Sequence, residues 1–293
     1  MKFDVAVIGG GPAGLSSGIF TSRAGLKTIC FEKLAVGGQA ALSYEIENYP
    51  GFNAISGFEL TQKMFEQAKG CGVEFLYEKV ISVTQTKTGF SVKTKNKSYQ
   101  ANKIIIACGT KQRKLGLGEE EFVGKGISYC ASCDGNFFKN KTVAVVGGGD
   151  SAFSYCEYLS RIAQKVYLLN RSEKFKASKV RIDSVKKLKN VEITTNAQIK
   201  KLKGEVKIES VVLNSGDELK VDGVFVAIGH VPDLEFINLD LSVDEHGYII
   251  VDKYMETNIK NVYACGDIVS KHFRQVVTAC AEGAIAGNSC VGV

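Results

Sequence analysis

Tryptophan is absent from the 293-residue chain, and proline, histidine and methionine occur only three times each. So few prolines, together with 45% hydrophobic and 23% charged residues, exclude long disordered stretches and favour a chain that folds throughout. Long apolar runs are also missing, since stretches such as Val143–Val146 and Ile104–Cys108 are far shorter than the roughly 20 residues that a membrane helix needs. Because Met1–Asp4 begins a strand pattern and not a signal peptide, we expect a cytoplasmic protein without a membrane segment.

The three histidines are too widely separated to join the cysteines in a zinc site, so no metal is expected. Nine cysteines in a chain of this length do not indicate a disulfide scaffold either, because seven of them stand alone among apolar or small residues, as core thiols do. These seven are Cys30, Cys71, Cys108, Cys156, Cys265, Cys280 and Cys290. Only Cys130 and Cys133 form a close pair, which makes them the candidates for chemistry.

Neither sign of charge is in large excess: 37 basic against 31 acidic residues give a net charge of +6 and an isoelectric point near 8.7. The lysines are scattered, for example at 186, 187 and 189 and at 200, 201 and 203, without interleaved aromatic residues or a nucleic-acid motif. We therefore expect no binding to DNA or RNA. The lysines indicate either a solvated face or a face for an acidic partner.

A glycine motif near the start of the chain indicates a dinucleotide-binding fold, and the length of the chain suits two such domains. Gly9–Gly14 lies between a β-branched strand at Phe3–Ile8 and a helix that runs to about Ala24. The strand Thr28–Phe31 follows and ends at Glu32, where a carboxylate can accept hydrogen bonds from an adenosine ribose.

The same order of elements returns in the middle of the chain. Strand Thr142–Val146 precedes Gly147–Ala152, which opens a helix to about Ala163, and a further strand follows at Val166–Leu169. Both motifs place backbone N–H groups at a helix N-terminus, an arrangement that binds a diphosphate. The rest of the chain is expected to form β segments at 191–195, 206–213 and 223–228 and a final helix from about Gln275.

Two residues separate Cys130 from Cys133, a spacing that brings the sulfurs within disulfide reach at a helix start. Asp134 follows directly and can act as a general acid and base. A redox dithiol is one interpretation, and a structural disulfide or two buried thiols are the alternatives. A thioredoxin-like domain is excluded, because tryptophan is absent and the pair lies between two dinucleotide motifs.

Short motifs follow one another along essentially the whole chain. They are Gly9–Gly14, Glu32, Gly37–Gln39, Asn48–Gly51, Ala107–Gly109, Cys130–Gly135, Gly147–Ala152, Val226–His230, Gly266–Asp267 and Arg274–Gln275. In this order they resemble the motifs of low-molecular-weight thioredoxin reductases. The Cys-x-x-Cys-Asp-Gly element before the second glycine motif is specific, because relatives of glutathione reductase carry their cysteines in the first domain.

The resemblance implies an α/β fold with two Rossmann-like dinucleotide-binding domains, the second inserted into the first. The FAD-binding domain would comprise residues 1–113 and 243–293, and the inserted NAD(P)-type domain with the cysteine pair would comprise residues 114–242. A homodimer is also implied. The FAD-binding residues implied by the resemblance are Gly9, Gly11, Pro12, Ala13, Gly14, Glu32, Gly38, Gln39, Asn48, Gly109, Gly266, Asp267, Arg274 and Gln275.

For catalysis, the resemblance implies that FAD passes electrons to a Cys130–Cys133 disulfide and that the dithiol reduces thioredoxin. Cys133 would be the sulfur nearest the flavin, and Cys130 would attack the disulfide of thioredoxin. Asp134 would then protonate the leaving thiolate.

The segment that should bind NADPH departs from the family. In place of His-Arg-Arg-x-x-x-Arg, residues Asn170–Lys176 read Asn-Arg-Ser-Glu-Lys-Phe-Lys, so that only Arg171 remains to meet a 2′-phosphate. Asn170 also stands where NADH would need a ribose-binding carboxylate. After the glycine motif, the bulky segment Phe153–Cys156 is expected to crowd the nicotinamide.

A subset of the family is reduced by ferredoxin, an acidic protein that needs no hydride site and that a basic surface attracts. The departures therefore favour ferredoxin as the electron donor. The alternative is an NADPH- or NADH-dependent enzyme that uses Gly147, Gly149 and Arg171. A non-catalytic flavoprotein redox sensor is the alternative from another class, although a sensor has no need of the intact Cys130, Cys133 and Asp134.

Overall fold

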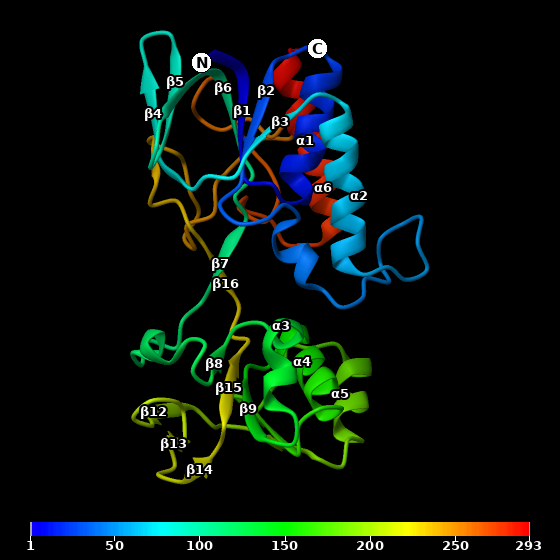
Figure 1. The fold of residues 1–293 in the computed structure, drawn as a ribbon, viewed down its shortest axis with the longest axis vertical. Helices are drawn as coiled ribbons and strands as arrows, with labels where there is room; N and C mark the ends of the chain where they lie inside the picture. Colours follow the sequence, from blue (N-terminus) through cyan, green and yellow to red (C-terminus); the bar gives the residue numbers. More distant parts are fainter. Residues whose placement is uncertain (1, 293) are drawn as a thin grey trace. The chain divides into compact units, whose positions relative to one another are not determined.

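The computed structural model describes residues 2–292, and the chain folds into two compact units. Unit 1 comprises residues up to Lys111 and from Val231 onward, and unit 2 comprises Gln112–His230. Two short strands, β7 (Thr110–Gln112) and β16 (His230–Pro232), pair with each other where the chain passes between the units (Figure 1). The chain is therefore α/β with one unit inserted into the other.

Unit 1 is built on an eight-stranded sheet whose parallel part carries the first glycine motif. The parallel strands lie in the order β3 (Glu74–Leu76), β2 (Thr28–Phe31), β1 (Lys2–Ile8), β6 (Ser98–Ile106) and β18 (Val262–Ala264). Strands β5 (Gly89–Thr94) and β4 (Val80–Thr86) extend the sheet in antiparallel fashion from β6, and β17 (Ile237–Asn238) pairs with β4. Buried, mostly β-branched strands of this kind are typical of a sheet that is covered on both faces.

Helices α1 (Pro12–Arg23), α2 (Gly57–Gly70) and α6 (Val276–Val291) cover one face of this sheet (Figure 1). Helices α1 and α6 approach closely because glycines face the neighbouring backbone: a Cβ at Gly283 would lie 2.2 Å from the Ala13 carbonyl oxygen. A short 3-10 helix, η1 (Gly38–Leu42), precedes α2, which begins at the N-cap Ser56.

Unit 2 repeats the arrangement with a second parallel sheet. Its order is β11 (Val191–Thr194), β10 (Lys165–Leu169), β9 (Thr142–Val146), β15 (Gly223–Val226) and β8 (Ile127–Ser128). Its helices are α3 (Ala131–Asp134), α4 (Asp150–Ser160) and α5 (Lys179–Lys186), with 3-10 turns η2 (Glu119–Phe122) and η3 (Gly135–Phe138). Strands β12 (Ile199–Lys203), β13 (Ser210–Leu213) and β14 (Glu218–Lys220) form a separate antiparallel sheet.

The second domain boundary differs from the expected one. Residues 231–242 were expected in the inserted domain, whereas the structure places them in unit 1. The physical reason is strand pairing and burial: Ile237 pairs with Val83 of β4, and Leu234 and Phe236 pack against the core of unit 1. The first boundary lies between Lys111 and Gln112, close to the expected residue 113.

Within residues 2–292, none of the helices is both long enough and apolar enough to span a membrane. The longest of them, α6, has 16 residues, about four fewer than a hydrocarbon core requires.

Candidate active site and cofactor cradle

The first glycine turn has the geometry that a bound diphosphate requires. Gly9 has φ +111°, and a Cβ on it would lie 2.4 Å from the Ala107 carbonyl oxygen. A Cβ on Gly14 would lie 1.9 Å from the Gly9 carbonyl oxygen, so this glycine permits the close packing of α1 on β1. Gly11 is different, because a Cβ there would meet no atom within 4 Å. The turn is thus closed by protein at Gly9 and Gly14 and open at Gly11, where α1 begins with Pro12.

Glu32 follows β2 and is buried against the same turn. One carboxylate oxygen accepts the N–H of Gly10 at 2.9 Å, and the other accepts the N–H of Leu34 at 3.0 Å. Each oxygen keeps a second lone pair. The carboxylate is therefore fixed at the end of the strand, where it can accept further hydrogen bonds from ribose hydroxyls.

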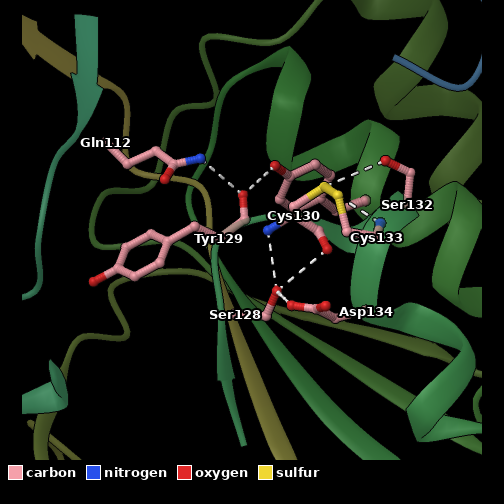
Figure 2. Close-up of a disulfide and its surroundings, with 8 residues drawn as sticks. Gln112, Ser128, Tyr129, Cys130, Ser132, Cys133 and Asp134 are labelled. Carbon is pink, nitrogen blue, oxygen red and sulfur yellow. Dashed lines mark hydrogen bonds between the residues drawn. A yellow bond between two sulfur atoms is a disulfide. The ribbon is translucent and has the colours of Figure 1, made fainter. Parts of the chain in front are cut away.

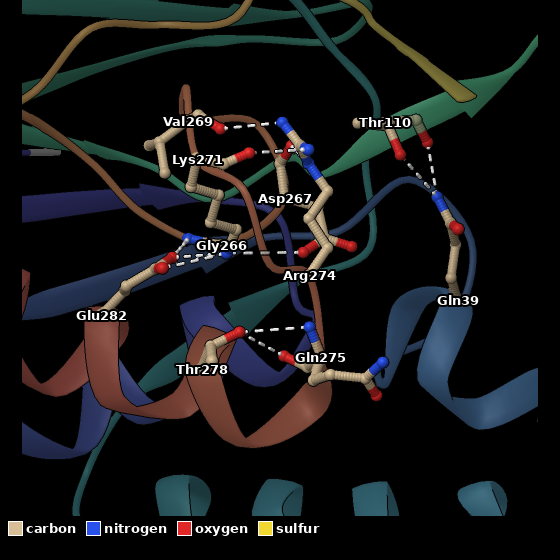
Figure 3. A network of polar contacts seen from close by, with 10 residues as sticks. All are labelled: Gln39, Thr110, Gly266, Asp267, Val269, Lys271, Arg274, Gln275, Thr278 and Glu282. Carbon is tan, nitrogen blue, oxygen red and sulfur yellow. Dashed lines mark hydrogen bonds and ion pairs between the residues drawn. The ribbon is translucent and has the colours of Figure 1, made fainter. Parts of the chain in front are cut away.

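Residues that are distant in the sequence meet at the carboxyl ends of the parallel strands of unit 1. A Cβ on Gly38 would lie 3.3 Å from the Gly11 Cα, and one on Gly266 would lie 2.8 Å from the Ala13 Cβ. The Gln39 side chain donates to the carbonyl oxygen of Thr110, the residue that follows Gly109, at 2.7 Å (Figure 3). Side-chain contacts also join Asn48 to Gln275, whose amide oxygen accepts from the Asn48 amide at 3.1 Å.

The loop after β18 is held by an ion-pair network (Figure 3). The Glu282 carboxylate of α6 accepts the Gly266 N–H at 2.9 Å and pairs with the Lys271 ammonium at 2.7 Å. Lys271 also lies 3.6 Å from the Asp267 carboxylate. Arg274 donates to the backbone carbonyls of Asp267, Lys271 and Val269, so that its guanidinium shapes the loop that presents Asp267.

Sequence reasoning missed Lys271, Glu282 and Thr110 as parts of this region. The spacing of Asp267 and Lys271, four residues apart, was an available signal for an ion pair. Glu282 carried no local signal, because its contact with Gly266 depends on how α6 packs against the sheet. Thr110 likewise contacts Gln39 only through the fold.

These residues fit FAD. The open Gly11 position at the start of α1 suits a diphosphate, and the fixed carboxylate of Glu32 suits a ribose. The cofactor-binding residues that the sequence indicated all lie in unit 1.

In unit 2, Cys130 and Cys133 are joined by a disulfide (Figure 2). Cys130 is the N-cap of α3 and is partly buried, whereas Cys133 is exposed. The Cys133 N–H donates to the Cys130 sulfur at 3.3 Å, and the Ser132 hydroxyl oxygen lies 3.4 Å from the same sulfur. After reduction, both groups can donate to a thiolate at Cys130, which lowers the free energy of the ionised form.

Asp134 is anchored by Ser128, the last residue of β8. The Ser128 hydroxyl donates to a carboxylate oxygen of Asp134 at 2.7 Å and accepts the Cys130 N–H at 3.0 Å (Figure 2). Gly135 follows directly, and a Cβ there would lie 2.8 Å from the ring of Tyr158. The Cys-x-x-Cys-Asp-Gly sequence is thus held against both β8 and α4.

The backbone before Cys130 is also fixed by side chains. The Tyr129 carbonyl oxygen accepts from the Tyr155 hydroxyl at 2.7 Å and from the Gln112 amide at 3.1 Å. The Tyr129 hydroxyl donates to Glu119, a fully buried carboxylate that also accepts backbone N–H groups of residues 115–117. Burial raises the pKa of Tyr129, and the Glu119 charge adds to this, so the phenol stays a donor.

The other seven cysteines are not bonded to one another. Cys30, Cys156, Cys265 and Cys290 are buried, and Cys71, Cys108 and Cys280 are partly buried. Burial raises the pKa of the Cys108 thiol to about 12, with a further contribution from the Asp233 charge. Burial likewise raises the pKa of the thiols at positions 30, 156, 265, 280 and 290, so these five and Cys108 stay protonated near neutral pH.

The family model for pyridine nucleotide-disulphide oxidoreductases matches residues 3–283. The chain belongs to this family. A thioredoxin reductase of Listeria monocytogenes is 42% identical over 98% of this chain and 92% of its own length. The crystal structure of Lactococcus lactis thioredoxin reductase in its FR conformation superposes with a TM-score of 0.93 at 38% identity, over 98% of this chain and 97% of that chain. A ferredoxin-flavin thioredoxin reductase of Clostridium acetobutylicum is 34% identical, with a TM-score of 0.56 over 99% and 97% of the two chains.

In a pyridine nucleotide-disulphide oxidoreductase, the second glycine motif is the candidate nucleotide site. Gly147 has φ +144°, and a Cβ there would lie 2.2 Å from the Ala227 carbonyl oxygen. Gly149 is the N-cap of α4, and a Cβ on it would meet no atom within 4 Å. The diphosphate part of the motif is therefore retained.

The segment after β10 has a different chemistry from the expected NADPH site. Asn170 is buried, and its amide donates to the carbonyl oxygens of Ser172 at 2.7 Å and Lys174 at 3.1 Å. The Lys176 N–H donates to the Gly148 carbonyl oxygen at 2.7 Å, which ties the loop to the glycine turn. Arg171 is exposed.

The expectation that Phe153–Cys156 crowds a nicotinamide is wrong for two of its residues. Phe153 and Cys156 are fully buried in the core of unit 2, and the Phe153 ring packs edge-on against Phe175 with a centroid distance of 5.1 Å. The reason is helical periodicity, which turns positions 153 and 156 of α4 toward the sheet. Tyr155 points elsewhere and hydrogen-bonds the Tyr129 carbonyl.

Proposed function

We propose that this chain is an FAD-dependent thioredoxin reductase in which the Cys130–Cys133 disulfide passes electrons to thioredoxin. The observation that carries the proposal is the bonded pair at the start of α3 with Asp134 beside it, in a chain whose first glycine turn fits FAD. Bound FAD would supply the two electrons that reduce the disulfide. The residues that hold FAD would be those described above at the first glycine turn and the strand ends of unit 1. A cytoplasmic location suits a disulfide that must be reduced repeatedly.

The two sulfurs have different roles in this proposal. The Cys130 thiolate, which the Cys133 N–H and Ser132 can stabilise, attacks one sulfur of the thioredoxin disulfide. The thioredoxin disulfide bond breaks, and its electron pair leaves on the second thioredoxin sulfur, which takes up a proton from solvent. Cys133 then attacks the Cys130 sulfur of the mixed disulfide, which re-forms the Cys130–Cys133 bond. The electron pair of the broken bond goes to the thioredoxin sulfur, and Asp134 gives that sulfur a proton.

The distribution of charge supports an acidic partner for unit 2. Unit 2 holds 20 of the 37 basic residues and 14 of the 31 acidic ones, whereas unit 1 holds 17 of each, so the net charge of +6 resides entirely on unit 2. An acidic thioredoxin that approaches the dithiol is thus attracted electrostatically. A donor that approaches FAD meets a unit with no net charge, so the lysines by themselves do not bring ferredoxin to the flavin.

For the donor we propose ferredoxin. The support is the altered segment after β10, where Asn170, Ser172 and Lys176 replace the residues that would hold NADPH. Each lost charge-assisted contact to a phosphate costs about 1.5–3 kcal/mol, roughly tenfold or more in affinity. The second candidate is NADPH or NADH, which the retained turn at Gly147 and Gly149 favours, with Arg171 as the residual cation.

An anaerobic reduction experiment separates these donors. Oxidised holoenzyme is mixed with reduced ferredoxin, NADPH or NADH, and flavin absorbance is followed. We expect rapid bleaching with ferredoxin only. Rapid bleaching by NADPH, lost in R171A, would establish the nicotinamide-dependent enzyme instead. Calorimetry with R171A as the control would show whether the nucleotide binds at all.

The whole activity is tested by giving chemically reduced holoenzyme an oxidised thioredoxin. Formation of thioredoxin thiols supports the reductase, whereas a protein that takes up flavin but never reduces thioredoxin would fit the redox-sensor alternative. The intact contacts of Asp134 favour the reductase, because a sensor has no use for a positioned proton donor.

We also propose a homodimer formed through unit 1. Several large apolar side chains of one stretch of unit 1 are exposed, namely Leu42, Tyr44, Phe52 and Phe58. Burial of such side chains against a second copy is favourable. Analytical ultracentrifugation of the wild type and of F58K tests this, and a monomer at every concentration would contradict it.

A further inference from the structure

Ser128 makes more contacts with the redox motif than its size suggests. It ends β8, pairs with Phe225 of β15 and is 3% exposed. Its hydroxyl oxygen accepts the Cys130 N–H at 3.0 Å. It also lies 2.7 Å from the Asp134 carboxylate and 3.2 Å from the Cys130 carbonyl oxygen (Figure 2).

The hydroxyl has two acceptors within reach but a single proton to donate. When Asp134 is ionised, the proton goes to the carboxylate, because the shorter, charge-assisted bond is the stronger one. When Asp134 is protonated, the carboxylic acid donates to the Ser128 oxygen, and the Ser128 proton can turn to the Cys130 carbonyl. Rotation of one O–H bond therefore keeps the Asp134 carboxyl group and the Ser128 hydroxyl hydrogen-bonded in both protonation states, without movement of a heavy atom.

We propose that Ser128 is a positioning residue for proton transfer by Asp134, an inference that rests on the proposed function. In the resolving step, Cys133 attacks as a thiolate after losing its proton to solvent, and the sulfur–sulfur bond between Cys130 and thioredoxin breaks while the Cys130–Cys133 bond forms. The electron pair goes to the thioredoxin sulfur, and the proton of the Asp134 carboxylic acid goes with it. Ser128 holds the carboxyl group at a fixed distance from Cys130 throughout the step. Once the carboxyl group has lost its proton, the Ser128 hydroxyl donates a hydrogen bond to the resulting carboxylate.

The test uses stoichiometrically reduced holoenzyme in single turnovers with oxidised thioredoxin. We expect S128A to slow thiol release by roughly ten- to a hundredfold, part of what general acid catalysis contributes. S128T, which keeps the hydroxyl, should recover most of the rate. The matched control is S210A, because Ser210 is also buried in unit 2 and donates to a carboxylate, Glu218, at 2.5 Å. S210A should react like the wild type.

A second substrate distinguishes loss of Asp134 positioning in S128A from general damage to the redox site. An aromatic disulfide such as 5,5′-dithiobis(2-nitrobenzoic acid) releases a thiolate that needs no proton, because the leaving group has a low pKa. S128A should therefore reduce it at the wild-type rate while it remains slow with thioredoxin. Equal slowing with both substrates, or no slowing with either, would overturn the role of Ser128. If the wild type reduces the aromatic disulfide but not thioredoxin, the proposed function fails instead, which is a distinct outcome.

Discussion

Glu32 and Asn170 hold equivalent places in the two units but offer different chemistry. Each directly follows the second strand of its motif, β2 or β10, and each lies against the second glycine, Gly10 or Gly148. Glu32 presents a carboxylate fixed by the N–H groups of Gly10 and Leu34. Asn170 instead donates its amide to the loop that follows it. A carboxylate is therefore present at this place in unit 1 and absent from it in unit 2.

From this relationship we expect E32A to weaken FAD binding by about ten- to a hundredfold, because a ribose loses a charged acceptor and two N–H groups lose theirs. The measurement is the dissociation constant of FAD for the apoprotein, from flavin fluorescence. E74A is the control, since Glu74 of β3 is an exposed carboxylate that pairs only loosely with Lys27 at 3.7 Å. Equal FAD affinity in E32A and wild type would show that Glu32 does not contribute to FAD binding.

Gly11 and Gly14 should respond differently to alanine. A Cβ at position 11 meets no protein atom, so G11A should fold normally yet bind FAD at least tenfold more weakly. At position 14 a Cβ would lie 1.9 Å from the Gly9 carbonyl oxygen, so G14A should lower the melting temperature of the apoprotein itself. Thermal unfolding with and without FAD distinguishes the two. A G11A protein with wild-type affinity for FAD would contradict the placement of FAD at this glycine turn.

The two cysteine variants should differ in whether they trap a mixed disulfide. C133S keeps the nucleophile and lacks the resolving thiol, so it should accumulate a mixed disulfide with thioredoxin through Cys130. C130S should form none, and both variants should retain FAD but lose turnover. Non-reducing electrophoresis and mass spectrometry detect the adduct, and C71S, at a partly buried cysteine outside the pair, serves as the control. An adduct in C130S alone would reverse the assignment of the two sulfurs.

Glu119 should make the stability of unit 2 depend on pH. Although burial opposes its ionisation, hydrogen bonds from backbone N–H groups and Tyr129 lower its pKa below the ordinary value of 4.5. A lowered pKa in the folded state stabilises the fold above pH 4.5, and this stability is lost as the pH falls through the lower pKa.

We expect E119Q to lose about 2–4 kcal/mol of unfolding free energy at pH 7, because the new amide opposes N–H donors with its own N–H groups. Urea unfolding between pH 3 and pH 7 measures both effects, and the variant should show a flatter pH dependence. Glu121 is exposed in the same turn, so E121Q should unfold like the wild type. An equal loss in both variants would show that the buried contacts of Glu119 are not the cause.

The charge of unit 2 should govern the rate of thioredoxin reduction. K200E/K201E reverses two exposed charges on β12, and we expect kcat/KM for an acidic thioredoxin to fall about two- to tenfold at low salt. The difference from wild type should shrink as ionic strength rises. K93E/K95E changes two exposed lysines of unit 1, one on β5 and one just after it, and should have little effect. The reverse pattern would place the encounter on unit 1.

Much of the fold was predictable because each of the two glycine motifs is preceded by a strand pattern and followed by a helix and a second strand. Strands 28–31 and 142–146 have the predicted bounds, and the first and last helices begin where they were expected. The predicted strand at 206–213 is shorter, since β13 starts only at Ser210, and α4 ends at Ser160 and not near Ala163. The boundary near residue 242 was misplaced because β17 is two residues long and is defined by its pairing with β4.

The sequence by itself determined the pair Cys130 and Cys133, the two glycine turns and the carboxylate Glu32, because their chemistry depends on spacing within one short segment. Only the tertiary structure decided that the Ser128 hydroxyl hydrogen-bonds the Asp134 carboxylate, that the Glu282 carboxylate accepts the Gly266 N–H and that Phe153 is buried in the core. Hydrogen bonds between distant segments and the side chain's direction on a helix depend on how elements pack. No local pattern of residues encodes that packing, so it had to be observed.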